Sequence, residues 1–158
     1  MPRIVIFGNS GSGKSTEARR LAQQYSMPRL DLDHIAWSSP GVRKPIEQSA
    51  VEIEQFIAAT PDWVAEGCYA DLLAFLLPHA TEVVFMNPGV DTCVANARAR
   101  PWERDKYASP EEQDARLEFL IEWIRQYETR SDEYSLVRHR ALFDRFAGPK
   151  REISELRR

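Results

Sequence analysis

At 158 residues, with 43% of them hydrophobic, the chain has the length and composition of one domain with a single buried core, here residues 1–158. A formal net charge of −3 gives no general attraction to nucleic acid, and no apolar stretch approaches the ~20 residues that cross a bilayer. Cys68 and Cys93 lack metal-ligand spacing and are expected to be free thiols. We therefore expect a cytoplasmic monomer that binds neither membranes nor nucleic acid.

The first stretch of the chain predicts a strand, a loop and a helix. An apolar run over residues 4–7 leads into GNSGSGKS, which fills every fixed position of the phosphate-binding motif G-x-x-x-x-G-K-[ST], and good helix formers follow at 16–22. The glycines let backbone N–H groups face phosphate oxygens, while Lys14 can reach the β- and γ-phosphates and Ser15 can ligate Mg²⁺. The predicted contacts with ATP are Gly8, Asn9, Ser10, Gly11, Ser12, Gly13, Lys14, Ser15 and Thr16.

The middle of the chain predicts two further strands with acidic ends. The first helix should end near Tyr25, and the alternation in residues 30–33 predicts a strand whose carboxylates, Asp31 and Asp33, share one face. After a polar gap at 38–41, helical apolar spacing begins with Pro45 as first helical residue and ends at 60–61. Residues 63–65 predict a third strand that ends in Glu66 and Gly67.

The last half of the chain predicts a strand–helix unit, a lid and two more helices. We expect a short helix over 72–77, a strand over 83–86, a helix over about 90–100 and a final strand over 150–153. Residues 101–109 are charged and without periodicity, so they are expected to form a mobile lid held only by Trp102 and Tyr107. Ser109 should cap the next helix, and a further helix should run over 131–146.

Strands that alternate with helices at this spacing predict an α/β fold, in which a mostly parallel five-stranded sheet carries helices on both faces. Ligands of such sheets lie outside the carboxyl ends of the strands. The phosphate-binding loop, Asp31, Asp33 and Glu66 should therefore gather along one rim of the sheet.

Three segments together resemble a known family. The loop, the stretch LDHIAW at 32–37 and the stretch WVAEGCY at 63–69 are similar to small P-loop kinases of the adenylate and shikimate kinase type, and more closely to adenylate-kinase-related "topology modulation" proteins. Glu66 and Cys68 depart from the Asp-Gly-Asn-Tyr that usually follows the third strand there. The resemblance implies a three-layer P-loop NTPase fold with a short lid, begun here by Arg100 and Pro101, and an enzyme that uses ATP and Mg²⁺.

Phosphoryl transfer needs alignment, a metal and positive charge on the migrating group, and each has candidate residues. The alternative roles are ordinary ones: the aspartates can cap a strand end, Glu66 can lie in a surface turn, the arginines can end a solvated helix, and Trp37 and Tyr69 can pack in the core rather than stack on an acceptor. The candidates are Lys14, Asp33 and Arg100 for catalysis, Arg98 and Arg100 for the triphosphate, Ser15, Asp31 and Glu66 for the metal, and Asp33, His34, Gly67 and Tyr69 for the acceptor.

Two functions are compatible with this pattern. The first is transfer of the ATP γ-phosphoryl group to a small acceptor, such as a nucleoside monophosphate or a shikimate-like hydroxyl compound. The second is a nucleotide-dependent regulatory or binding protein that hydrolyses ATP slowly and has no small-molecule acceptor. The sequence does not choose the acceptor, because specificity does not follow from the fold.

Overall fold

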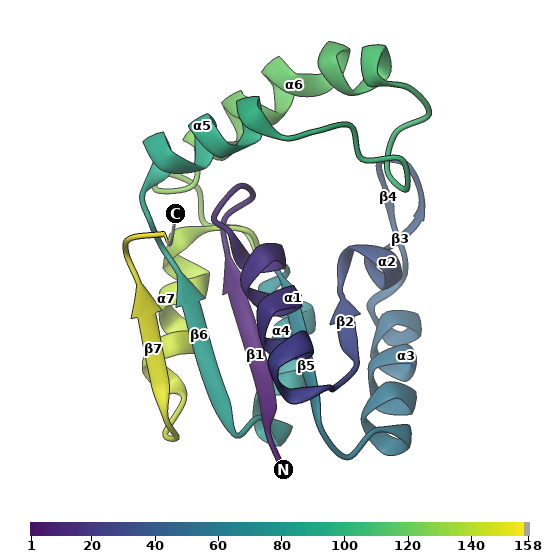
Figure 1. Ribbon diagram of the computed structural model, residues 1–158, viewed down its shortest axis with the longest axis vertical. Helices are drawn as coiled ribbons and strands as arrows, with labels where there is room; N and C mark the ends of the chain where they lie inside the picture. Colours follow the sequence, from purple (N-terminus) through teal and green to yellow (C-terminus); the bar gives the residue numbers. More distant parts are fainter. Residues whose placement is uncertain (157–158) are drawn as a thin grey trace.

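A five-stranded parallel sheet forms the centre of the protein, whose computed structural model describes residues 1–156 (Figure 1). Every neighbouring pair of its strands is parallel, in the order β2-β5-β1-β6-β7. The predicted α/β sheet is thus confirmed. The strands are β1 (Arg3–Gly8), β2 (Arg29–Asp31), β5 (Trp63–Gly67), β6 (Glu82–Met86) and β7 (Lys150–Ile153).

Helices cover both faces of the sheet because successive side chains of a strand point to opposite sides. Ile4 and Ile6 of β1 face α1 (Lys14–Tyr25), which packs Ala18 and Leu21 against them. Phe7 faces the other side, where α3 (Ile46–Ala59), α4 (Ala70–Leu76), a 3₁₀ turn (Leu77–His79) and α7 (Leu136–Arg145) pack. Figure 1 shows α1 in front of the sheet with α4 and α7 behind it, which completes the three predicted layers.

Two antiparallel helices lie across the carboxyl ends of the strands (Figure 1). They are α5 (Val90–Ala99) and α6 (Pro110–Arg125), which we call the arm, and Cys93, Ala97 and Ile124 are buried between them. The Ser109 hydroxyl accepts a hydrogen bond from the backbone N–H of Glu112 (3.1 Å), so α6 starts with the predicted cap. Residues 100–109, the lid, connect the two helices at the end of the arm nearest β2.

The structure corrects two predicted element boundaries. The strand predicted over 30–33 ends at Asp31, and Asp33 instead begins the short helix α2 (Asp33–Ala36). The cause is local, because Asp31 Oδ1 accepts a hydrogen bond from the backbone N–H of Asp33 (2.9 Å) and turns the chain. The helix predicted from 131 begins only after Ser135, whose hydroxyl caps α7 by accepting from the N–H of Arg138 (3.2 Å).

A small hairpin in the predicted polar gap was not foreseen. Its strands β3 (Trp37–Ser39) and β4 (Val42–Arg43) are joined by a turn in which Gly41 has a φ of 78°.

Pro45 is the N-cap of α3 rather than its first helical residue, so the helix begins one residue later than predicted. Cys68 and Cys93 are buried free thiols, as expected. None of the helices in the described part of the chain combines the length and apolarity that a membrane span requires.

Candidate phosphate-binding and acceptor site

The phosphate-binding loop is held against the arm by its own shape. Gly11 has a φ of 77°, and a Cβ there would lie 2.4 Å from the carbonyl oxygen of Cys93, so the approach of the loop to α5 requires glycine. Asn96 Nδ2 donates to the Gly11 carbonyl (2.8 Å), and Asn9 Nδ2 donates to the carbonyl of Ile124 (3.2 Å). The loop therefore has a fixed conformation with contacts to both helices of the arm.

The groups that the loop presents fit a polyphosphate. Gly13, at a φ of 91°, is the N-cap of α1. Within residues 1–156 no side chain caps the N-terminus of this helix, and the buried Ser12 hydroxyl has no hydrogen-bond partner. Unpaired donors at a helix N-terminus favour anions. Lys14 Nζ donates to the Asn9 carbonyl (3.2 Å). Ser10 is half-buried, as Lys14 is, and Thr16 is exposed in the first turn of α1.

Ser15 and Glu66 form the link between the loop and the neighbouring strand. The Ser15 hydroxyl donates to Glu66 Oε1 (3.0 Å), and Glu66, 1% exposed, lies beside Ile6 in the β1–β5 register. Burial raises the pKa of Glu66 to about 7, although the charge of Lys14 opposes the rise, while the Arg29 guanidinium lies 3.8 Å away. A hydroxyl backed by a carboxylate is a donor set that fits Mg²⁺, with water and phosphates as the other ligands.

No cluster of three or more histidine, cysteine or acidic side chains is gathered as a protein-only metal site in the described residues. Asp31 uses one oxygen to start α2, and its other oxygen lies 3.9 Å from Nε2 of the exposed His34. One carboxylate oxygen of Asp31 thus caps the end of β2, and the role of Asp31 at the metal stays a prediction.

Asp33 lies across the rim with both carboxylate oxygens in use. The Tyr69 hydroxyl donates to Oδ1, and Lys106 Nζ donates to Oδ2 at 2.7 Å. Burial by itself raises the pKa of Asp33, but Lys106, Tyr69 and the more distant Lys14 outweigh it and hold the pKa below its ordinary value. Asp33 is therefore an ionised carboxylate whose pKa is lowered in part by the charge of Lys14 in the loop.

The expectation that only Trp102 and Tyr107 hold the lid was wrong. Trp102 Nε1 does donate to the Tyr107 carbonyl (3.0 Å), but the lid also reaches the sheet side through Lys106 and through Asp105, whose Oδ2 is 3.3 Å from His34 Nε2. The backbone N–H of Glu103 donates to the Gln113 side chain (2.7 Å). Polar contacts to α2 and α6 therefore hold the lid together with Trp102 and Tyr107.

The two predicted arginines contact acidic side chains of the arm and the lid. Arg98 Nη1 is 3.1 Å from Glu118 Oε1 of α6, and Arg100 Nη1 is 3.1 Å from Glu103 Oε1. Either arginine would have to exchange its carboxylate for a phosphate in order to bind the triphosphate. The lid cation that contacts the rim is instead Lys106.

Gly67 allows two backbone segments to approach closely. A Cβ on Gly67 would lie 2.8 Å from Cβ of Leu32, the residue that connects β2 to α2. The position thus needs glycine for packing, and this packing sets the distance between the end of β5 and Asp33.

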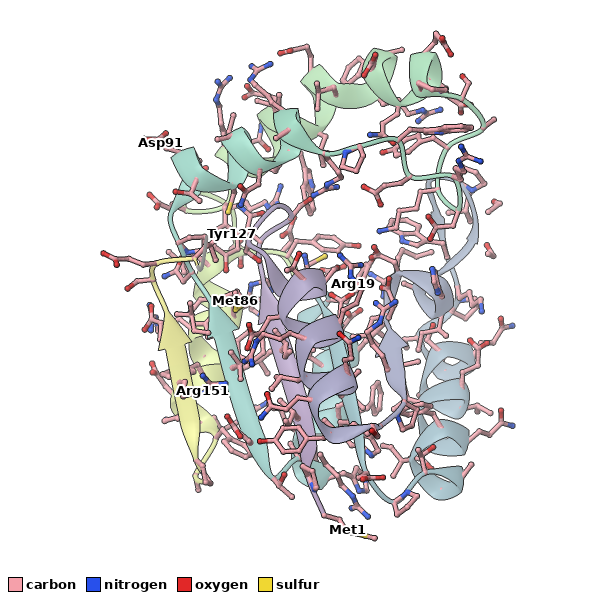
Figure 2. All side chains as sticks on the ribbon, viewed as in Figure 1. Met1, Arg19, Met86, Asp91, Tyr127 and Arg151 are labelled. Atoms are coloured by element: carbon pink, nitrogen blue, oxygen red, sulfur yellow. The ribbon has the colours of Figure 1, made fainter. Side chains whose placement is uncertain are left out.

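A buried histidine joins the arm to the sheet. His139 of α7 has Nε2 2.8 Å from the Cys68 carbonyl and Nδ1 2.7 Å from the Tyr127 hydroxyl, just after α6. Burial lowers the pKa of His139 to about 4, so the ring is neutral, with Nε2–H donating to the carbonyl and Nδ1 accepting from the tyrosine. Figure 2 shows Tyr127 beneath the arm, close to the end of β1.

We expect His139→Gln to lower the free energy of unfolding at pH 7 by about 2–4 kcal/mol, because two buried partners lose their hydrogen bonds. The stability of the parent protein should also fall between about pH 6.5 and pH 4, since the unfolded histidine binds a proton there while the folded one does not. The contribution of Glu66 to the pH dependence has the opposite sign. Because its pKa is raised in the folded state, Glu66 favours the folded protein more as the pH falls.

The test is urea unfolding from pH 4.5 to 7.5, in which the difference between the parent and His139→Gln isolates the histidine from Glu66. The exposed His79→Gln serves as the control and should leave both the stability and its pH slope unchanged. Identical pH slopes for the parent and His139→Gln would show that folded His139 binds its proton over the same pH range as in the unfolded chain, which contradicts a neutral buried ring.

Comparisons with known proteins agree with this fold. Among solved structures, a shikimate kinase from Bacteroides thetaiotaomicron superposes with a TM-score of 0.51 at 19% identity, over 79% of this chain and 78% of that one. A gluconokinase from Sinorhizobium meliloti 1021 superposes with a TM-score of 0.53 at 17% identity, over 98% of this chain and 84% of that one. At such identities the likeness shows the fold, which is the predicted three-layer P-loop NTPase fold.

The sequence relatives are more local. An adenylate kinase from Methylobacterium nodulans is 30% identical over 69 residues, which are 44% of this chain and 35% of that enzyme. The chain thus matches about a third of the length of this curated relative. No protein-family model matches it. The chain is similar to P-loop kinases of nucleotides and small molecules.

Proposed function

We propose that the protein is an ATP-dependent phosphotransferase that moves the γ-phosphoryl group of ATP to a small acceptor, either a nucleoside monophosphate or a shikimate-like hydroxyl compound. The observation that carries the proposal is the convergence of Lys14, the Ser15–Glu66 pair and the ionised Asp33 at one rim. The charge of Lys14 acts on both Glu66 and Asp33, although these two carboxylates come from different elements. A triphosphate on the loop and an acceptor at Asp33 would have the γ-phosphoryl group between them.

Each residue has a role in this proposal. The loop would bind the phosphates through its N–H groups, and Ser15, Glu66 and Asp31 would hold Mg²⁺, directly or through water. The metal would neutralise negative charge on the phosphates. Asp33 orients the acceptor hydroxyl and takes its proton as the oxygen attacks. Lys14 stabilises the charge of the migrating group, joined by Arg100 or Arg98 once an arginine leaves its carboxylate.

The kinases that share the fold or part of the sequence support transfer to a small molecule. Because shikimate kinase, gluconokinase and adenylate kinase differ in acceptor, they support the reaction type and leave the acceptor to experiment. The single domain over residues 1–158 and the cytoplasmic monomer stay predictions.

The proposal is tested by incubating the protein with ATP, Mg²⁺ and a panel of nucleoside monophosphates and polyols, and by measuring ADP that forms only when an acceptor is present. Lys14→Ala controls for contaminating kinases. Tight ATP binding without acceptor-dependent ADP from any compound would contradict the kinase and favour the nucleotide-dependent binding protein.

Glu66→Gln is expected to raise the Mg²⁺ concentration needed for half-maximal binding of an ATP analogue by about tenfold, because a neutral amide holds metal-bound water less well than a carboxylate. Calorimetric titration at several Mg²⁺ concentrations measures this shift without any turnover. Glu52→Gln, which removes a carboxylate paired with Lys44 (2.8 Å), is the matched control. An unchanged Mg²⁺ requirement in Glu66→Gln would remove this residue from the metal site.

A further inference from the structure

A chain of hydrogen bonds runs from the β3–β4 hairpin to the lid through Asp33. Trp37 Nε1 donates to the Tyr69 hydroxyl oxygen (2.8 Å), Tyr69 donates to Asp33 Oδ1, and Lys106 Nζ donates to Asp33 Oδ2 (2.7 Å). The direction of the chain is fixed, because the indole N–H can only donate. The hydroxyl proton of Tyr69 therefore points at Asp33.

The ring of Tyr69 is packed on several sides and does not present a face for an acceptor to stack on. The residue is 3% exposed, its ring lies edge-on to Trp37 (6.2 Å between centroids) and Tyr134 (5.4 Å), and the Arg43 guanidinium lies 5.0 Å from its centroid. Burial, with Asp33 close by, raises the pKa of Tyr69, so the hydroxyl keeps its proton. The polar contribution of this residue to the rim is one fixed hydroxyl donor.

We propose that Tyr69 is a positioning residue for Asp33: its hydroxyl fixes Oδ1 and thereby turns Oδ2 toward the lid. The contact with Lys106 marks the direction of Oδ2, since Lys106 lies in the lid and Tyr69 lies at the opposite side of the carboxylate. The same arrangement anchors the lid, because Lys106 can pair with Oδ2 only while the carboxylate holds this orientation.

A consequence for catalysis rests on the proposed phosphotransferase function. An acceptor hydroxyl would approach Asp33 from the lid side and would take the place of Lys106 on Oδ2. Lys106 would then be released at the moment when an acceptor arrives, with its charge next to the transferring group. Tyr69 would raise the rate of transfer without contacting ATP.

The anchoring is tested by amide hydrogen exchange of residues 100–109 in the protein without nucleotide. Tyr69→Phe should speed exchange of the lid about tenfold, because the carboxylate loses one fixed partner and its ion pair with Lys106 weakens. Asp33→Asn should have a similar effect, and the double variant should exchange no faster than Asp33→Asn alone, since both act through the same carboxylate.

Tyr134→Phe is the matched control, because it removes a hydroxyl from the same aromatic cluster that contacts Arg43 Nη1 (2.8 Å) and not Asp33. It should leave exchange of the lid unchanged. Equal lid exchange in Tyr69→Phe and the parent would overturn the proposal, as would additive effects of Tyr69→Phe and Asp33→Asn. Exchange raised equally by Tyr134→Phe would show general loosening of the cluster and would also overturn it.

The exchange experiment uses neither ATP nor an acceptor, so its result is separate from the fate of the proposed function. With an acceptor found by the panel, Tyr69→Phe should lower kcat about tenfold and leave the KM for ATP within about twofold. A lowered kcat together with an unchanged lid would place the hydroxyl on the acceptor itself and contradict the positioning role.

Discussion

Lys14→Ala is expected to lower acceptor phosphorylation by about 10²–10³-fold and to leave the free energy of unfolding nearly unchanged. Among the residues that the structure describes, Lys14 Nζ makes a single hydrogen bond, to the Asn9 carbonyl (3.2 Å), so its removal costs the fold little. With ATP bound, the same ammonium would neutralise charge that develops on the γ-phosphoryl group, which no neighbouring cation of the loop replaces.

The measurement pairs initial rates of acceptor-dependent ADP formation with urea unfolding of the same preparations. Lys44→Ala is the control, because Lys44 pairs with Glu52 on α3, away from the loop, and its loss should leave the rate intact. A Lys14→Ala protein that still phosphorylates its acceptor at the parent rate would refute the assigned role of the loop.

Asp33→Asn is expected to lower the rate of transfer at saturating substrates by about 10²–10⁴-fold, the range for loss of a general base, and to change the affinity for ATP less than about twofold. The amide can still accept a hydrogen bond from Tyr69, but it can neither take a proton nor pair with the Lys106 ammonium. In the proposed complex ATP would bind on the side of the loop, and none of the hydrogen bonds of the loop in the described residues involves Asp33.

The matched control is Asp71→Asn, which removes a carboxylate that pairs with Arg43 at 3.1 Å, away from the loop. Binding by calorimetry and rates by ADP release are measured on each variant. If Asp33→Asn lost ATP affinity but kept its rate at saturation, Asp33 would belong to the nucleotide side of the site.

The sheet and the loop could be predicted because their signals are local. The apolar runs of β1 and β6 and the motif at 8–15 specify strand, loop and helix within a few residues of each other. The start of α2 was missed because alternating Leu and Asp suggests a strand, whereas the Asp31 carboxylate bonds the backbone two residues on and turns the chain. The short pattern is thus compatible with a strand and with a turn, and the hydrogen bond of the Asp31 side chain selects the turn.

The lid contacts had no signal in the sequence. Lys106 and Asp33 are 73 positions apart, and His34 and Asp105 are 71 apart, so their meeting depends on how the arm crosses the sheet. Arg98 could be read as a phosphate ligand because its carboxylate partner, Glu118, meets it only when α5 and α6 pack together, whereas Arg100 pairs with Glu103 three residues further on. Composition identifies which side chains can form ion pairs, but it does not tell which pairs form.

The two asparagine contacts between loop and arm divide the arm into a root and a tip. Asn9 Nδ2 donates to the carbonyl of Ile124 at the end of α6, and Asn96 Nδ2, in the last turn of α5, donates to the carbonyl of Gly11, so both helices are attached to the loop. A rigid-body rotation of the whole arm would break both hydrogen bonds and distort the phosphate-binding loop. If ATP binds at the loop as proposed, lid motion that preserves its binding would be confined to the tip, beyond Ala97, and the root would serve as one wall of the nucleotide site.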